Sequence, residues 1–212
     1  MRSRHPDYRA YRKVREAVAR ILAGASSGAV IADELEAWHR ELFMPCVDAG
    51  LTSVADLSGY RRTQVYIAGS RYTPPSAAKV PDAMGAFLDL IRTKSEPLVQ
   101  AILGHFFFVH IHPYADGNGR TARFIMNAAL VSSGFAWKVI PVEQRREYMS
   151  ALETASVYGD ISDFAEFVIG SSTLVAMPEQ IKDMGVNEAE GYVNAKLIHN
   201  IGTKKDSHWV LS

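Results

Sequence analysis

The sequence has little that would connect it with an oxidising compartment, a membrane or a polyanion. Its 212 residues include one cysteine, Cys46, which excludes an intrachain disulfide and fits a reducing compartment. No apolar run approaches the roughly 20 residues that cross a bilayer, and the basic N-terminus lacks the apolar core of a signal peptide. Lysine plus arginine and aspartate plus glutamate number 23 each, so no net charge attracts nucleic acid or anionic lipid. We therefore expect a cytoplasmic protein with no membrane segment and no nucleic-acid partner.

Apolar residues, by contrast, are abundant and recur at helical spacing. They make up 48% of the chain, which is enough for one domain of moderate size with an appendage. The spacing predicts an all-α fold. Helices are expected over residues 7–23 and about 31–43, from 80 onward, from 97 to 111, from about 120 to 133, about 142–156 and 162–175.

One short β-hairpin is expected between the second and third of these helices. Residues 60–67 favour a strand, residues 68–70 turn, and residues 71–73 return before Pro74 and Pro75. An isolated two-stranded hairpin is barely stable. The hairpin should therefore lie on the helices.

The most informative stretch is residues 112–123, which read His-Pro-Tyr-Ala-Asp-Gly-Asn-Gly-Arg-Thr-Ala-Arg. Asp116 offers the hard oxygen ligands that a divalent cation such as Mg²⁺ takes together with phosphate oxygens. Gly117 and Gly119 can adopt positive φ and turn backbone N–H groups towards one anion. The helix that begins near Arg120 directs its N-terminal dipole to the same point.

Two arginines and a histidine complete this group. Arg120 and Arg123 lie three residues apart, where two guanidinium groups can hold phosphate oxygens. His112 can take a proton from an attacking hydroxyl near neutral pH. Each feature alone is ordinary, but together they indicate a polyphosphate ligand. Zinc bound by His105, His110 and His112 is disfavoured, because these residues do not share a helix face and no cysteine is near.

The loop resembles the signature of the Fic family, His-Pro-Phe-x-Asp/Glu-Gly-Asn-Gly-Arg-x-x-Arg. Only Tyr114, which stands where the family has Phe, departs from it; the hydroxyl that it adds needs a partner or water. The resemblance covers roughly residues 8–175 and implies a Fic-type helical bundle with the hairpin as a flap over the loop. We expect a catalytic domain over 1–175, with the flap at about 60–75 and the active-site loop at 112–123, and an extension of unknown role over 176–212.

The resemblance also implies an activity, the transfer of AMP from Mg-ATP to a Ser, Thr or Tyr hydroxyl of a target protein. In this hypothesis His112 is the general base, Arg120 steadies the loop and the phosphates, and Arg123 reaches the terminal phosphate. A tyrosine at the place of Tyr148 lies against the adenine in relatives. The expected catalytic residues are His112, Asn118, Arg120 and Arg123; the nucleotide-binding residues are Gly117, Asn118, Gly119, Arg120, Arg123, Tyr148, Thr63 and Val65; the metal ligand is Asp116.

Other functions within and outside this class stay open. Fic-type proteins also transfer UMP, phosphocholine or a terminal phosphate, although the Doc type usually replaces the two loop glycines by Ala and Lys. A nucleotide-sensing module with little turnover is the alternative from another class. The resemblance further implies that a target protein docks at the flap edge by β-augmentation. A homo-oligomer is also left open.

Many Fic proteins carry an inhibitory motif, Ser/Thr-x-x-x-Glu-Gly/Asn. Glu166 follows Ser162 at the right spacing but precedes Phe167, and Glu190 precedes a glycine but follows Val186 where Ser or Thr is required. Neither fits. Three alternatives remain: the inhibitory motif lies on a separate antitoxin-like protein, it was lost with an upstream segment, or there is none.

Overall fold

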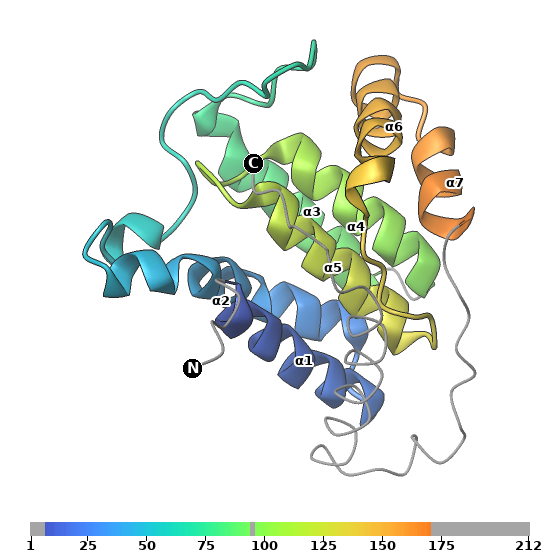
Figure 1. Ribbon diagram of the computed structural model, residues 1–212, viewed down its shortest axis with the longest axis horizontal. Coiled ribbons are helices and arrows are strands. Elements are labelled where there is room, and N and C mark those ends of the chain that lie inside the picture. Colours follow the sequence, from blue (N-terminus) through green and yellow to red (C-terminus); the bar gives the residue numbers. More distant parts are fainter. Residues whose placement is uncertain (1–6, 94–95, 171–212) are drawn as a thin grey trace.

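The computed structural model describes residues 7–93 and 96–170, and this part of the chain is helical (Figure 1). The prediction of an all-α fold is confirmed. The α-helices are α1 (Tyr8–Leu22), α2 (Ser27–Asp48), α3 (Val80–Thr93), α4 (Pro97–Ile111), α5 (Asn118–Ser132), α6 (Arg145–Tyr158) and α7 (Ser162–Gly170). Short 3₁₀ turns are η1 (Ala55–Leu57), η2 (Ala77–Lys79) and η3 (Val142–Gln144).

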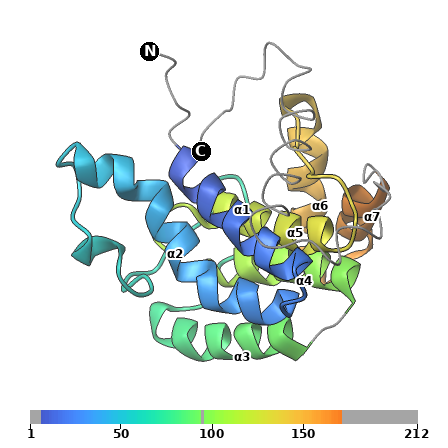
Figure 2. The same ribbon diagram turned by 90° about the horizontal axis from the view of Figure 1, so that it is seen from below.

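Helices α4 and α5 form the centre of the bundle and pack chiefly against each other. Helices α1 and α2 pack together and both contact α5, while α3 lies against α2 and α4 (Figures 1 and 2). Helix α7 contacts α4, and α6 packs on α7. The loop between α4 and α5, residues 112–117, therefore projects from the middle of the molecule, with neighbours on several sides.

Helix α4 is buried because its sequence is apolar nearly all round. Pro97 occupies its first turn, where its missing N–H costs nothing, and Phe108 is fully buried in the core. Helix α4 ends at Ile111, as the sequence predicts. The next residue, His112, turns the chain into the loop. No helix in the described residues is both long and apolar enough to span a membrane.

Helix α2 is longer than predicted at both ends. It starts at Ser27 because the Ser26 side chain accepts a hydrogen bond from the N–H of Ala29 at 3.4 Å. It then continues through Pro45 to Asp48. A proline near the end of a long helix removes a single hydrogen bond, and this loss does not stop the last turn.

The predicted β-hairpin is not confirmed. Residues 60–75, which we call the flap, run outward and back (Figure 1) around a turn closed by the Ser70 N–H and the Ile67 carbonyl at 3.1 Å. The two arms of this segment do not pair as β-strands. Side chains link the arms instead, as Gln64 Nε2 donates to the Pro74 carbonyl at 3.0 Å. Pro74 and Pro75, which follow the predicted return strand, have no N–H to extend a ladder towards the base of the arms.

The predicted extension over 176–212 lies outside the described residues. The same holds for Glu190, one of the two glutamates compared with the inhibitory motif. The other, Glu166, lies exposed on α7.

Candidate active site

His112 caps the C-terminus of α4 in the left-handed conformation, with φ 53 and ψ 58. Its Nδ1 lies 3.2 Å from the Val109 carbonyl. Since a carbonyl only accepts, Nδ1 carries the proton of the neutral ring and Nε2 is left as the basic nitrogen. No described residue hydrogen-bonds to Nε2. Burial lowers the pKa of His112 below its ordinary value, and the charge of Arg61 acts in the same direction.

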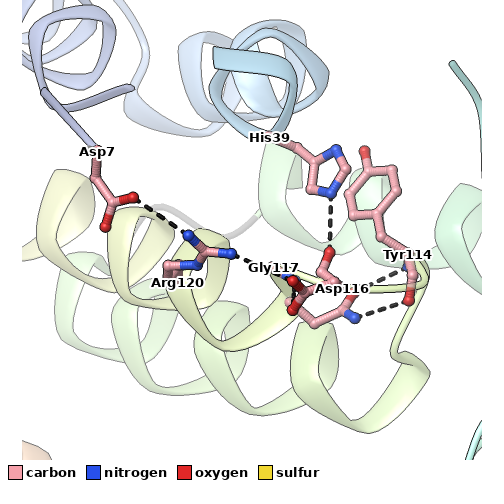
Figure 3. Close-up of polar contacts among 7 residues, drawn as sticks. Asp7, His39, Tyr114, Asp116, Gly117 and Arg120 are labelled. Atoms are coloured by element: carbon pink, nitrogen blue, oxygen red, sulfur yellow. Dashed lines mark hydrogen bonds and ion pairs between the residues drawn. The ribbon is translucent and has the colours of Figure 1, made fainter. Parts of the chain in front are cut away.

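The side chain of Asn118 holds the loop in shape. Its Oδ1 accepts the Tyr114 N–H at 2.9 Å, and its Nδ2 donates to the Tyr114 carbonyl at 2.8 Å (Figure 3). The Tyr114 ring is buried and stacks on the His39 ring with a centroid distance of 3.5 Å. Both ends of the Asn118 amide are therefore engaged, and its predicted contact with phosphate stays a prediction.

Asp116 is fixed through its backbone while its carboxylate stays accessible. His39 Nε2 donates to the Asp116 carbonyl at 3.0 Å (Figure 3). Burial lowers the pKa of His39 to about 4, so its ring is neutral at physiological pH. The carboxylate accepts the Gly117 N–H at 2.6 Å and is 66% exposed. One N–H that was expected to face phosphate is thus turned towards the neighbouring carboxylate.

Gly117 is required by both conformation and space. Its φ is +83, and a Cβ placed there would come within 2.8 Å of the Phe43 ring. Gly117 is also the N-cap of α5 and has no side chain to bond the amides of the first turn. The first turn of α5 therefore has no side-chain cap, and the Asp116 carboxylate lies next to its N-cap residue, Gly117.

Arg120 connects this loop to α1. Its Nη1 lies 3.2 Å from Asp7 Oδ1 and its Nη2 3.5 Å from Asp116 Oδ2 (Figure 3). Its guanidinium also lies over the Phe43 ring at 5.0 Å from the centroid. Two carboxylates and a ring hold this arginine, and its predicted roles towards the loop and the phosphates stay predictions.

Arg123, one turn further along α5, has a different environment. No carboxylate within the described ranges is ion-paired with it. It lies near the buried pair of Tyr148 and His105, whose hydroxyl and Nε2 are 2.9 Å apart. Burial, with the positive charge of Arg123 as the smaller cause, lowers the pKa of His105 to about 3. Tyr148 is only 6% exposed, so its predicted contact with adenine stays a prediction.

The flap is seated on the site at its base and tethered at its tip. Arg61 donates to the carbonyls of Thr63 and His112, which brings the Thr63 backbone beside the loop. Val65 lies further out and accepts from its neighbour Gln64. At the tip, Glu153 of α6 accepts from the Ser70 hydroxyl and from the Arg71 N–H at 2.9 Å. Nucleotide contacts by Thr63 and Val65 stay predictions.

Four supporting residues escaped sequence reasoning, namely Asp7, His39, Phe43 and Arg61. Each comes from a segment far from the loop and carries no local pattern that would announce its role. His39 and Phe43 are spaced four apart on α2, a spacing that marks a shared helix face. Only that signal was present, and it is equally typical of any core helix.

Comparison with known proteins agrees with this geometry. Residues 30–130 match the sequence model of the Fic/DOC family. A "Protein adenylyltransferase Fic" of Nematostella vectensis is 41% identical over 113 residues, covering 51% of this chain and 26% of the relative. Another of that name, from Drosophila grimshawi, is 34% identical over 155 residues, covering 67% of this chain and 32% of the relative. The chain thus spans between about a quarter and a third of these curated relatives.

Solved structures share the fold. Fic-1 (residues 134–508) from C. elegans superposes with a TM-score of 0.57 at 22% identity, covering 96% of this chain and 55% of that one. A Fic family protein from Desulfovibrio desulfuricans G20 superposes with a TM-score of 0.53 at 23% identity, covering 96% and 57%. Together with the matched signature loop, these findings show that the chain carries a Fic domain and belongs to the Fic/DOC family.

Proposed function

We propose that this chain is a protein adenylyltransferase, which transfers AMP from ATP to a hydroxyl of a target protein. Relatives named protein adenylyltransferase are 31–41% identical to it. The observation that carries the proposal is the state of His112. Its Nδ1 is tied to the Val109 carbonyl, so Nε2 is a basic nitrogen with no protein partner among the described residues.

The proposed reaction forms one bond and breaks one bond at the α-phosphorus of ATP. The target hydroxyl oxygen forms a bond to the α-phosphorus of ATP, and its proton passes to Nε2 of His112. The bond from the α-phosphorus to the oxygen bridging to the β-phosphate breaks, and pyrophosphate leaves. A lowered pKa suits this base, since His112 is then neutral and ready to accept a proton at physiological pH.

Asp116 fits a Mg²⁺ site. Its carboxylate is mostly exposed, and one carboxylate with phosphate oxygens and waters is an ordinary Mg²⁺ environment. Bound there, the cation would neutralise phosphate charge. Arg120 Nη2 also contacts Oδ2 of this carboxylate, at 3.5 Å, and the exposed group keeps room for a metal beside that contact.

The phosphates are assigned to the start of α5 and to Arg123. The first-turn amides, including that of Gly119, lack a side-chain cap, and together with the helix dipole they favour an anion. Arg123 has no competing carboxylate among the described residues, so it can pair with the terminal phosphate. Arg120 is already held by Asp7 and Asp116, so we assign it to the shape of the loop, and Asn118 to the same role.

The flap is proposed as the docking edge for an extended segment of the target. Within the described residues its arms form no ladder, so the main-chain groups that Arg61 and Gln64 do not engage are left for a partner strand. Thr63, Val65 and Tyr148 are proposed as contacts of the nucleotide. A separate inhibitory protein, self-association and a role for residues 176–212 are compatible with this assignment.

The nucleotide preference can be read by mass spectrometry. The chain is incubated with a cell lysate, Mg²⁺ and equal ATP, UTP, GTP and CTP, and modified peptides are identified by the added mass. We expect adenylyl groups on Ser, Thr or Tyr. Uridylyl or phosphoryl groups in their place would contradict the proposal and favour another Fic-type transfer. Arg123→Ala should reduce the labelling more than Arg120→Lys.

A further inference from the structure

Arg61 is a buried cation at the base of the flap. It is only 6% exposed, and no carboxylate among the described residues forms an ion pair with it. A buried charge without a counter-ion is costly unless hydrogen bonds satisfy it. The hydrogen-bond partners of Arg61 therefore indicate which contacts offset the cost of burying its charge at the base of the flap.

The hydrogen bonds of Arg61 go to main-chain carbonyls of two segments. Its Nε donates to the His112 carbonyl at 2.7 Å, and its own backbone N–H donates to the Pro113 carbonyl at 2.8 Å. Its Nη1 donates to Thr63 at 2.8 Å and its Nη2 to Pro75. One side chain thus joins the two arms of the flap to the catalytic loop.

The carbonyl bound by Nε belongs to the strained residue of the loop. A left-handed conformation is unfavourable for a residue other than glycine and persists only where neighbours determine it. Arg61 holds the two carbonyls that follow the His112 α-carbon, those of His112 and Pro113, and thereby fixes the direction in which the chain leaves His112. Its planar guanidinium reaches three acceptors at once, which a lysine ammonium on a flexible stem cannot match.

We propose that Arg61 is a positioning residue, which aims the imidazole of His112 and makes its alignment depend on the seating of the flap. This inference rests on the proposed function of His112 as general base. It gives the flap a second role. A target segment that orders the two arms would also fix the base, so the base is aligned when a substrate is docked.

A double-mutant cycle tests this inference. Arg61→Met removes the hydrogen bonds and keeps much of the apolar stem, Arg61→Lys keeps the charge, and Arg92→Met is the matched control at an exposed arginine of α3, outside the flap. We expect Arg61→Met to lower kcat of AMP transfer about 10–100-fold, as misplacement of a reacting group does, with the Kd for ATP changed less than about twofold. In the His112→Ala background the same substitution should change the residual rate less than about threefold. Arg61→Lys should recover part of the loss, and Arg92→Met should leave the rate unchanged.

Equal losses in both backgrounds, or a lost affinity for ATP, would assign Arg61 to general stability and overturn the proposal. Thermal unfolding of each variant checks that it is folded before the rates are compared. If Arg61→Met does not fold, Arg61→Lys is compared in the same two backgrounds, and failure of both to fold would also overturn it.

A second readout does not need turnover. The ring ¹H–¹³C signal of His112, assigned by its loss in His112→Ala, should shift or broaden in Arg61→Met and stay in place in Arg92→Met. An unmoved signal in Arg61→Met would contradict the proposal. If the wild-type chain transferred no AMP, the proposed function would fail, and this spectrum would still decide whether Arg61 positions His112.

Discussion

Within the described ranges, His112 alone among residues other than glycine has a positive φ. Strained residues of this kind gather at functional sites, where the surrounding contacts hold them. Here the Phe108 carbonyl accepts the backbone N–H of His112 and the Val109 carbonyl accepts from its ring Nδ1. Arg61 donates to its carbonyl. The strained residue therefore stands at the junction of α4 and the loop.

This strain predicts an order of stability between two inactive variants. His112→Gly should be more stable than His112→Ala by about 1 kcal/mol, because glycine adopts the left-handed conformation without a Cβ clash and alanine does not. Urea unfolding monitored by circular dichroism gives the difference. Equal midpoints, or a more stable alanine variant, would show that φ at residue 112 relaxes.

Asp116 carries the prediction about the metal. Asp116→Asn keeps the side-chain volume and removes the charge, so most of the enhancement of ATP affinity by Mg²⁺ should disappear. Asp163→Asn, at an exposed aspartate of α7, is the matched control. Calorimetric titration of ATP with and without Mg²⁺ measures the effect, and an unaltered enhancement in Asp116→Asn would move the metal site elsewhere.

At the residue scale, sequence reasoning was most informative where the residues are contiguous. The loop from His112 to Arg123 could be identified because its groups occur within one stretch. Asp7, His39 and Arg61 could not, since their roles exist only after folding brings α1, α2 and the flap to the loop. Asn118 shows a further limit, because the sequence does not reveal that its amide bonds the Tyr114 backbone.

At the scale of elements, helices followed from apolar periodicity and the flap did not. Helix α4 has the predicted bounds because Pro97 and the loop define both ends. The flap has a strand-like composition, yet Arg61 and Gln64 take its carbonyls and two prolines offer no N–H. Strand propensity alone does not state where the backbone hydrogen bonds will go.

The flap tip supports a prediction about local motion. Glu153→Gln weakens the contacts with Ser70 and Arg71 and should raise deuterium exchange of the flap, while global stability changes by less than about 1 kcal/mol, as for other exposed pairs. Asp33→Asn removes a comparable exposed pair with Arg92 and should leave the flap unchanged. Exchange mass spectrometry compares the two. Equal flap protection in both variants would mean that Glu153 does not tether the tip.

At the scale of the molecule, the active-site loop is held from three directions. Helix α1 contributes Asp7, α2 contributes His39, and the flap contributes Arg61. Composition and periodicity established the helical class but not this arrangement. The topology was expected only through resemblance to the Fic family.

This support also predicts how the whole fold responds to acid. The pKa of His39 falls from its ordinary value of 6.5 to about 4 in the folded chain. The unfolded state therefore binds a proton first, so stability is fully present above pH 6.5 and declines as pH falls towards 4. His39→Gln retains a donor for the Asp116 carbonyl but cannot ionise. Urea unfolding at several pH values should show a shallower decline for this variant, and parallel curves would contradict the assignment.

The fate of labelled ATP tests the central claim most directly. The purified chain is incubated with Mg²⁺ and either α-labelled or γ-labelled ATP, in parallel with His112→Ala, and the protein is separated and counted. The α-label should appear on protein with the wild-type chain, and His112→Ala should lower that rate by about 10²–10⁴-fold while binding ATP almost as well. Protein labelled from γ-labelled ATP instead, or α-labelling that persists in His112→Ala, would contradict AMP transfer by this histidine.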